Sequence, residues 1–195
     1  MNYEKTGQLI AALRKERGWT QRKLAEEMNL SDRTISKWER GHGCPDISLL
    51  RELTQLLNVD IDQLLSGELT INQQSNGNLK SIAFYSCETC GNSSFSIGKM
   101  DVSCCGRHLE ALTAYSAGQK HQMKREDIES EVYLTFDHPM TKEHYISFIA
   151  AVSGDKVWLA KLYPEQEAAV RIPKFYGAAI YSYCTKEGLF RHDEL

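Results

Sequence analysis

The stretch TQRKLAEEMNLSDRTISKWERG, residues 20 to 41, decides the fold of the first part of this chain. Thr20 and Ser31 are preferred helix N-caps, and each precedes apolar residues at helical spacing. Gly41 is of the residue type that commonly follows the end of a helix. The stretch therefore predicts two short helices joined by a tight turn, with Ile35 and Trp38 on the inner face of the second helix.

Three more helices are expected around this stretch. Apolar residues recur at helical spacing before it and stop at Gly18, and Asp46 follows a proline at the start of a leucine-rich segment. Asp60 with Gln63 three residues later is the capping-box pattern of a fifth helix. We expect residues 1–66 to form a compact all-α domain of five helices.

The amino-acid composition and the pattern of apolar residues change after this domain. Residues 67–81 are rich in Ser, Asn, Gln and Gly and lack apolar periodicity, which indicates a linker. Runs of β-branched and aromatic residues follow, and SGDK at 153–156 is typical of a hairpin turn. We therefore expect an α+β multidomain chain whose second half is mostly β and forms a small sandwich.

Composition limits the class of protein. The chain has 195 residues, of which 42% are hydrophobic and 25% charged, so disorder is not expected. No apolar run approaches the roughly 20 residues of a membrane span, and the first residues lack the pattern of a signal peptide. We expect a cytoplasmic protein without a membrane partner.

Residues 20–41 resemble the helix-turn-helix of the phage-repressor type, often called the XRE family. The shared features are Thr-Gln at the start of the first helix, Leu-Ala inside it, and Ile-Ser-Lys-Trp-Glu-x-Gly in the second. The resemblance covers about residues 5–66. It implies a regulator that binds double-stranded DNA with the second helix in the major groove, as a homodimer on a two-fold site.

The resemblance also indicates DNA-contacting residues. Asp32, Arg33 and Lys37 match base-reading positions, whereas Gln21 and the region of Ser31 match phosphate contacts. Residues 1–67 hold ten Lys/Arg and ten Asp/Glu, so DNA binding would depend on where the charges lie. The alternative is an ordinary solvated helix face. The full expected set is Gln21, Ser31, Asp32, Arg33, Thr34, Ser36, Lys37 and Arg40.

Four cysteines lie within twenty residues of the second half. Cys87 and Cys90 form Cys-x-x-Cys, and Cys104 and Cys105 are adjacent. Thiols stay reduced in the cytoplasm, so this cluster points to a tetrahedral metal site before a disulfide. A vicinal disulfide and free core thiols are the alternatives. The adjacent pair resembles the desulforedoxin-type iron module, expected over residues 82–113; zinc is an alternative metal.

Residues 82–195 as a whole resemble desulfoferrodoxin, a two-iron superoxide reductase. The motifs are Lys120-His121, His138-Pro-Met through His144-Tyr-Ile, and Cys184 followed by Gly-Leu. The resemblance implies an immunoglobulin-like β-sandwich over residues 114–195 with an iron held by histidines and a cysteine. If the chain is a reductase, Lys120 is the catalytic residue that attracts the superoxide anion.

Two residues depart from the family pattern. Glu187 stands where the family has its fourth histidine, and Gln119 replaces a glutamate. A carboxylate beside the Cys184 thiolate would favour Fe(III) over Fe(II). The expected second metal site is His121, His138, His144, Cys184 and, as a ligand or a lost position, Glu187.

Three functions remain open at this stage. The first is a transcriptional regulator whose iron-binding domain senses redox state, superoxide or iron supply. The second is a superoxide reductase tethered to a DNA-binding domain, against which Glu187 and Gln119 count. The third is a DNA-binding protein with a purely structural metal.

Overall fold

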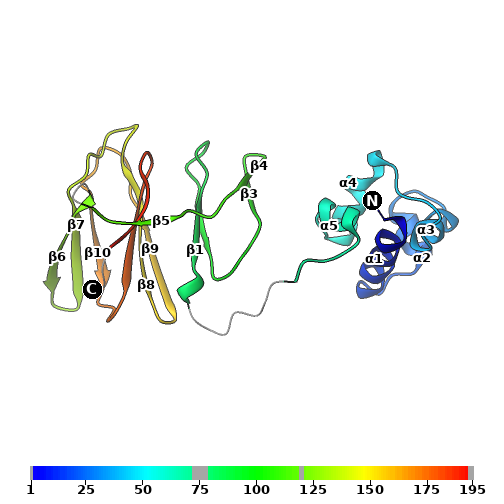
Figure 1. Ribbon diagram of the computed structural model, residues 1–195, viewed down its shortest axis with the longest axis horizontal. Coiled ribbons are helices and arrows are strands. Elements are labelled where there is room, and N and C mark those ends of the chain that lie inside the picture. Colours follow the sequence, from blue (N-terminus) through cyan, green and yellow to red (C-terminus); the bar gives the residue numbers. More distant parts are fainter. Residues whose placement is uncertain (1, 72–78, 119–120, 193–195) are drawn as a thin grey trace. The chain divides into compact units, whose positions relative to one another are not determined.

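The computed structural model describes residues 2–71, 79–118 and 121–192. The chain divides into two compact units, Met1–Ile71 and Asn72–Leu195 (Figure 1). The five α-helices lie in the first unit and the β-sheets in the second, which confirms the expected α+β class. No helix within these ranges is long and apolar enough to cross a membrane.

The first unit is the predicted five-helix domain. The N-caps Thr20, Ser31 and Asp46 each accept a hydrogen bond from a backbone N–H of the following turn. Ile35 and Trp38 are buried in the core that all five helices share, as the helical spacing predicts. The helices are α1 (Tyr3–Glu16), α2 (Gln21–Glu27), α3 (Asp32–Glu39), α4 (Ile47–Leu57) and α5 (Ile61–Ser66).

The capping box predicted for α5 does not form. Asp60 caps the helix by accepting from the N–H of Asp62 at 2.8 Å. The Gln63 side chain does not return to Asp60, because its Oε1 accepts from the N–H of Thr70 at 2.6 Å. Gln63 thus holds the segment after α5 against the helix through Thr70.

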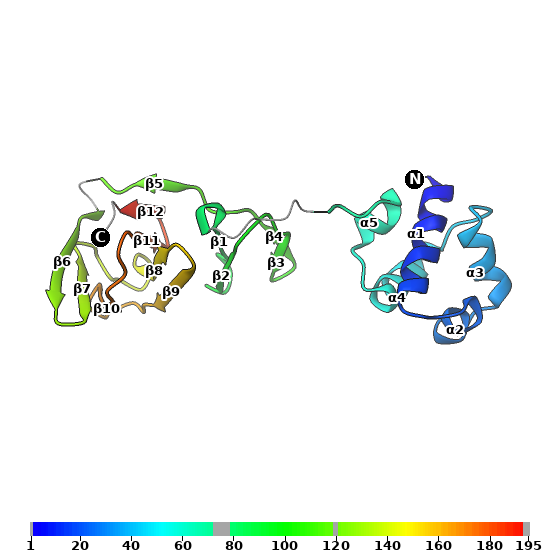
Figure 2. The ribbon, with the colours of Figure 1, turned by 90° about the horizontal axis from the view of Figure 1, so that it is seen from below.

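The second unit contains a two-sheet sandwich and a smaller module. One sandwich sheet has the strand order β10-β7-β6 and the other has β5-β12-β11-β8-β9 (Figure 2). Its strands are β5 (Ala114–Ser116), β6 (Met123–Ile128), β7 (Glu131–Phe136), β8 (Ile146–Ser153), β9 (Lys156–Lys161), β10 (Ala169–Pro173), β11 (Ala179–Cys184) and β12 (Gly188–His192).

The sandwich core lies between these two sheets. Leu134 and Ile172 from the three-stranded sheet pack with Ile149 and Ile180 from the five-stranded sheet, and all four are fully buried. The predicted SGDK turn joins β8 to β9, whose pairing runs to Ser153 and Lys156. β5 pairs with β12 in parallel, a contact between segments about 75 residues apart.

The cysteine-containing module packs directly on the five-stranded sheet. The ring of Phe84 lies 5.6 Å from that of Phe148 and 5.2 Å from that of Tyr181, centroid to centroid. Lys161 of β9 also donates to the carbonyl of Gly91. The module consists of a short 3₁₀ turn (Leu79–Ser81) and two hairpins, β1 (Ala83–Ser86) with β2 (Ser93–Ser96) and β3 (Val102–Cys104) with β4 (Arg107–Leu109).

Candidate nucleic-acid interface and metal centres

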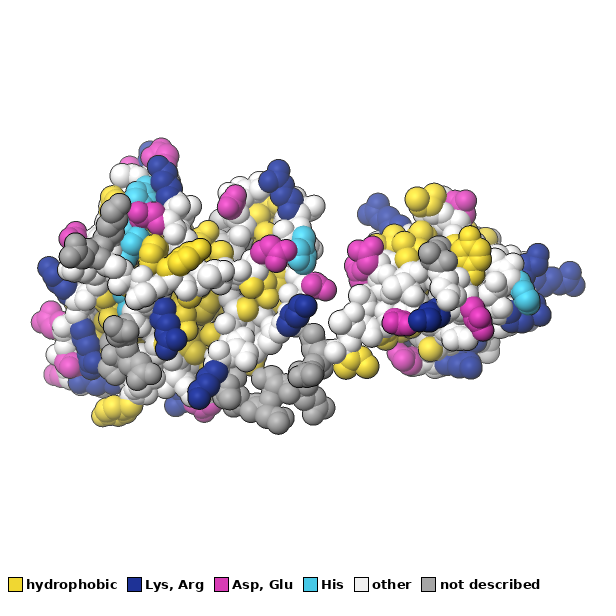
Figure 3. All heavy atoms as spheres, viewed as in Figure 1, with side chains coloured by type: hydrophobic (Ala, Val, Ile, Leu, Met, Phe, Trp, Pro, Cys, Tyr) yellow, Lys and Arg dark blue, Asp and Glu magenta, His cyan; other side chains and the backbone are white. Residues whose placement is uncertain are grey.

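The polar face of α3 is open to solvent. Asp32, Arg33, Lys37 and Arg40 are exposed, whereas Ile35 on the opposite face is fully buried. Lys and Arg side chains project from the end of the unit where α2 and α3 lie (Figure 3). A shallow hollow of about 370 Å³ runs between these helices, lined by Gln21, Asp32, Arg33, Ser36, Lys37 and Arg40.

The two remaining residues of the predicted DNA-binding set lie at the start of α3, where Ser31 is the N-cap and Thr34 is in the first turn. Ser31 Oγ accepts from the N–H of Thr34 at 3.1 Å and lies 2.9 Å from the Thr34 hydroxyl. The structure thus brings together six of the eight predicted residues around one hollow, with the other two at the first turn of α3. A helix N-terminus is a favourable place for a phosphate.

A buried ion pair underlies this face and was missed in the sequence. Arg14 of α1 donates to both carboxylate oxygens of Glu39, at 2.5 and 2.9 Å, and to the carbonyl of Trp19 at 2.5 Å. Glu39 also accepts from Gln21 Nε2 at 2.8 Å. The available signal was a charged residue, Arg14, directly after the inner-face residue Leu13.

This ion pair fixes both the charge of Glu39 and the orientation of Gln21. Burial raises the pKa of Glu39, but hydrogen bonds from Arg14 and Gln21 and the nearby guanidinium hold it below its usual value. Because one N–H of the Gln21 amide points to Glu39, the second N–H is left for the outer surface. The amide at the start of α2 is therefore held as a donor.

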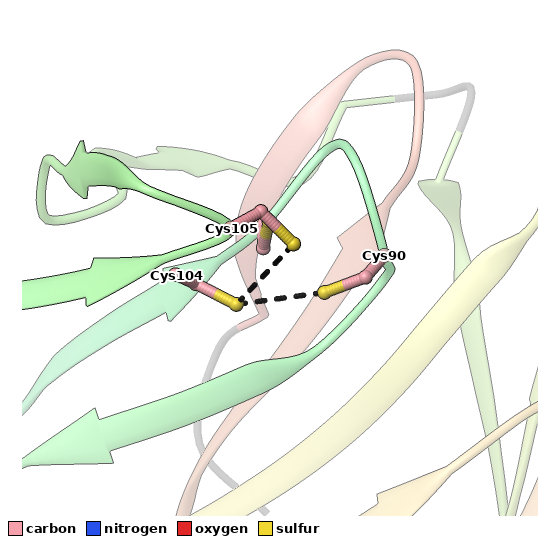
Figure 4. Close-up of side chains that lie close together, drawn as sticks. Cys90, Cys104 and Cys105 are labelled. Carbon is pink, nitrogen blue, oxygen red and sulfur yellow. Dashed lines mark hydrogen bonds between the residues drawn. The ribbon is translucent and has the colours of Figure 1, made fainter.

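The four clustered cysteines come together at the tips of the two module hairpins. The Cys104 sulfur lies 3.5 Å from that of Cys90 and 4.0 Å from that of Cys105 (Figure 4). All four sulfurs, including that of Cys87, lie within 4.8 Å of one another. A metal with four sulfur ligands at about 2.3 Å would place neighbouring sulfurs about 3.8 Å apart. The spacing therefore suits a tetrahedral metal ion.

A vicinal disulfide is not present in this cluster. The 4.0 Å between the sulfurs of Cys104 and Cys105 is about twice an S–S bond length. Cys105 has a positive φ of 51°, which turns its side chain toward the same centre as that of its neighbour. This backbone conformation explains how adjacent cysteines, whose side chains normally diverge, both face one point.

The thiol pKa values differ between the cysteines of the cluster. Backbone N–H groups of Cys90 and Thr89 lower the pKa of Cys87 to about 6, with further lowering by the thiols of Cys90 and Cys104. Hydrogen bonds with neighbouring cysteines raise the pKa of Cys105 to about 12. Cys87 is therefore the cysteine best prepared to bind a cation as a thiolate.

The second candidate site lies at one end of the sandwich. His121 precedes β6, His138 and His144 flank the loop between β7 and β8, and Cys184 ends β11. Glu187 lies in the turn that joins β11 to β12. Strand pairing thus gathers residues from four segments that are as much as 66 positions apart.

One carboxylate oxygen of Glu187 is the meeting point of these side chains. It lies 2.8 Å from His121 Nε2, 3.1 Å from His144 Nε2 and 3.5 Å from His138 Nε2. The Cys184 sulfur lies 3.7 Å from the same oxygen. Burial raises the pKa of Glu187, but hydrogen bonds from His144 and His121 lower it to about 2.

Two of the histidines have a protonation state or an orientation that suits a metal ligand. The imidazole of His138 has no exposed surface, and neither of its ring nitrogens has a hydrogen-bond partner within the described part of the chain. Burial and the proximity of His121 lower its pKa and so favour the neutral form that binds metals. Phe190 stacks on His121 with centroids 3.8 Å apart and fixes the plane of that ring.

These donors fit a transition-metal ion. Buried polar atoms almost always have a partner, and a metal ion would supply one to His138 Nε2. Three imidazoles, a thiolate and a carboxylate are all ligands that iron or zinc accepts. Burial raises the pKa of Cys184, yet its sulfur accepts a hydrogen bond from the N–H of Lys186 at 3.4 Å, a contact that stabilises a thiolate.

Three further residues of the sequence are not among the converging side chains that the structure describes. Lys120 and Gln119 lie outside the described residues. His192, which lies near Glu187 in the sequence, forms a buried hydrogen bond of 2.9 Å with Ser182 and is not part of the converging group.

Known proteins resemble both units. The helix-turn-helix family HTH_3 matches residues 10–64. The HTH-type transcriptional activator BcrR of Enterococcus faecalis is 42% identical over 79 residues, which are 39% of this chain and 39% of that protein. An uncharacterized HTH-type transcriptional regulator of Bacillus subtilis, YazB, is 31% identical over 68 residues, 35% of this chain and 99% of that protein.

The second unit has relatives of a different kind. A desulfoferrodoxin of Clostridium acetobutylicum is 37% identical over 57 residues, 29% of this chain and 46% of that protein. The crystal structure of the superoxide reductase from Treponema pallidum superposes with a TM-score of 0.51 at 21% identity, covering 59% of this chain and 98% of that structure.

The relatives differ in how much of their own length this chain spans. The chain spans less than half the length of the activator BcrR and of the clostridial desulfoferrodoxin. It spans nearly all of the Bacillus regulator and of the superoxide reductase structure. The chain therefore belongs to the helix-turn-helix family of transcriptional regulators and carries, behind that domain, a unit related to desulfoferrodoxin with the superoxide reductase fold.

Proposed function

We propose that this chain is a DNA-binding transcriptional regulator whose second unit binds iron and senses redox state, superoxide or iron supply. The single observation that supports it most is the convergence of three histidines and Cys184 on the Glu187 carboxylate, in a chain that also carries a helix-turn-helix. A metal held by these donors can change its oxidation state or its occupancy, and either change can be passed on to DNA binding.

On the DNA side, the unit binds as a homodimer with one α3 in each of two successive major grooves. Arg33 and Lys37 lie one helical turn apart on the exposed face and read base edges, and Gln21 donates its free N–H to a phosphate. Ser31, Thr34, Ser36 and Arg40 complete the contact surface with Asp32. This arrangement uses the exposed face without requiring a net positive charge on the unit.

On the metal side, Cys87, Cys90, Cys104 and Cys105 hold one ion, either iron or zinc. His121, His138, His144, Cys184 and Glu187 hold a second. When bound, iron at the second site supplies one-electron redox chemistry toward superoxide or an electron carrier. The anionic Glu187 and Cys184 together favour the oxidised ion in this partly buried site.

The test has two parts. The protein is purified anaerobically, and its metal content and visible spectrum are measured before and after exposure to superoxide. An operator is then selected from random DNA, and its affinity is measured for oxidised, reduced and metal-free protein. We expect iron, reversible thiolate charge-transfer bands and an operator affinity that differs between the three forms. Equal affinity for all three would refute metal-linked regulation and leave a DNA-binding protein with a structural metal.

Superoxide reduction is a second candidate function for the same site. The observation in its favour is the clustering of His121, His138, His144 and Cys184 within a superoxide reductase fold. Glu187 counts against efficient turnover, because an extra anionic donor makes re-reduction of the metal harder. A Glu187→His variant that consumes superoxide much faster than the wild type would show that the wild-type site is not an efficient catalyst.

A further inference from the structure

We propose that Thr185 is a positioning residue that fixes the distance between the His144 imidazole and the donors of the Cys184–Glu187 turn, and so sets the metal affinity of the second site. The inference rests on the proposed metal at this site. Thr185 touches none of the converging donor atoms and acts through the backbone.

Three hydrogen bonds connect Thr185 to the segment that carries His144. Its N–H donates to the carbonyl of Tyr145 at 3.0 Å. Its hydroxyl accepts from the N–H of Tyr145 at 3.2 Å and donates to the carbonyl of Glu143 at 3.5 Å. The residue directly after Cys184 is thus fastened to the residues on both sides of His144.

Regular strand pairing does not replace this connection. The register between β8 and β11 shifts at Tyr183 and Cys184, so Cys184 pairs with Ile146, and the ladder ends there. Beyond that point the hydroxyl of Thr185 bridges an N–H and a carbonyl two residues apart on the His144 segment. The Thr185 hydroxyl therefore adds two hydrogen bonds to the backbone bond that joins the two donor-bearing segments beyond the ladder.

The other side of His144 is fixed locally. Thr141 and His144 exchange backbone hydrogen bonds of 2.9 and 3.3 Å, and the Thr141 hydroxyl accepts from the His144 N–H at 3.1 Å. These bonds shape the loop within itself but do not connect it to β11. Removal of the Thr185 hydroxyl leaves the loop intact while loosening its distance to Cys184 and Glu187.

Thr185 can be replaced without opening the core. It is exposed, and valine has nearly the same shape as threonine but lacks the hydroxyl. Groups that orient metal ligands typically contribute about 10- to 100-fold to metal affinity. Because water can partly replace an exposed hydrogen bond, we expect Thr185→Val to weaken binding by about tenfold, at the lower end of that range. Serine keeps the hydroxyl, so Thr185→Ser retains the wild-type affinity.

The probe is Co²⁺, added to metal-free full-length protein in competition with a chelator. Cobalt bound by the triple variant His138→Ala/His144→Ala/Cys184→Ser, which keeps only two of the five donors, defines the contribution of the four-cysteine site, and the remainder reports the second site. We expect Thr185→Val to bind the second cobalt more weakly and with a shifted ligand-field spectrum. Thr113→Val, the same change at another exposed threonine, is the matched control and is expected to behave as the wild type.

The outcomes separate this inference from the proposed function. If Thr185→Val matches the wild type in affinity and spectrum, or if Thr185→Ser is as defective as Thr185→Val, the positioning role is refuted. If the wild type and the triple variant bind the same amount of cobalt, the second metal site itself is refuted and with it the basis of the inference. A defective Thr185→Val rescued by Thr185→Ser supports the role.

Discussion

The buried pair between Arg14 and Glu39 allows a quantitative test of what holds the DNA-binding unit together. Their side chains are 8% and 6% exposed, and the Glu39 carboxylate accepts three hydrogen bonds. In Glu39→Gln one acceptor oxygen becomes an NH₂ group that faces an N–H, and the guanidinium loses its counter-charge. Breaking a buried pair in this way costs about 3–5 kcal/mol.

This cost is a large fraction of the stability of a small domain, which is about 5–15 kcal/mol. At about 4 °C per kcal/mol, the lower bound predicts a fall in melting temperature of at least about 12 °C. The assay is circular dichroism at 222 nm, because the α-helices among the described residues all lie in the first unit.

The control replaces both partners. In Arg14→Met with Glu39→Met no charge remains buried, and replacement of a buried pair by apolar residues is often close to neutral. We therefore expect the double variant to be more stable than Glu39→Gln. The reasoning is wrong if Glu39→Gln melts within about 3 °C of the wild type, since that shift corresponds to less than about 1 kcal/mol.

Three other predictions concern DNA reading, metal binding and pH. Arg33→Ala should lose about 1–3 kcal/mol of discrimination at the base that Arg33 reads, measured by fluorescence anisotropy on operator variants. Arg51→Ala, on the exposed side of α4, is the control and should not lose discrimination. Equal effects of the two substitutions would argue against base reading by α3. Cys90→Ser should remove one metal ion per chain by elemental analysis and leave the other, and loss of both or of neither would contradict two independent sites. The folded-state pKa of Glu39 is depressed, so its contribution to stability is present above the unfolded value of about 4.3 and is lost as the pH falls through the lower folded value. The helical unit should therefore lose stability below about pH 4, and Glu39→Gln should lose less over that range; an equal slope in both proteins would show that other carboxylates dominate.

Local chemistry made much of the first unit predictable. The caps Thr20 and Ser31 and the buried Ile35 and Trp38 act within a few residues of one another, so the sequence alone indicates them. The Arg14–Glu39 pair joins residues 25 positions apart, and helical periodicity carries no information about such a contact.

The second unit was predictable only in part. The spacing of its cysteines and histidines, together with the resemblance, identified every side chain that the structure brings together at the two candidate metal sites. The parallel pairing of β5 with β12, the stacking of Phe190 on His121 and the hydrogen bonds of Thr185 were not predicted. All three depend on strand register, which is set by the packing of the whole sandwich.

The distribution of the donors along the chain has a consequence for how the protein is made. The DNA-binding unit ends by residue 71, the four cysteines lie between 87 and 105, and the second donor set is complete only when residue 187 exists. At about 5–20 residues per second, a ribosome needs on the order of ten seconds to pass from the first unit to Glu187. Each newly synthesised molecule can therefore fold its helix-turn-helix unit before its second candidate metal site is fully formed.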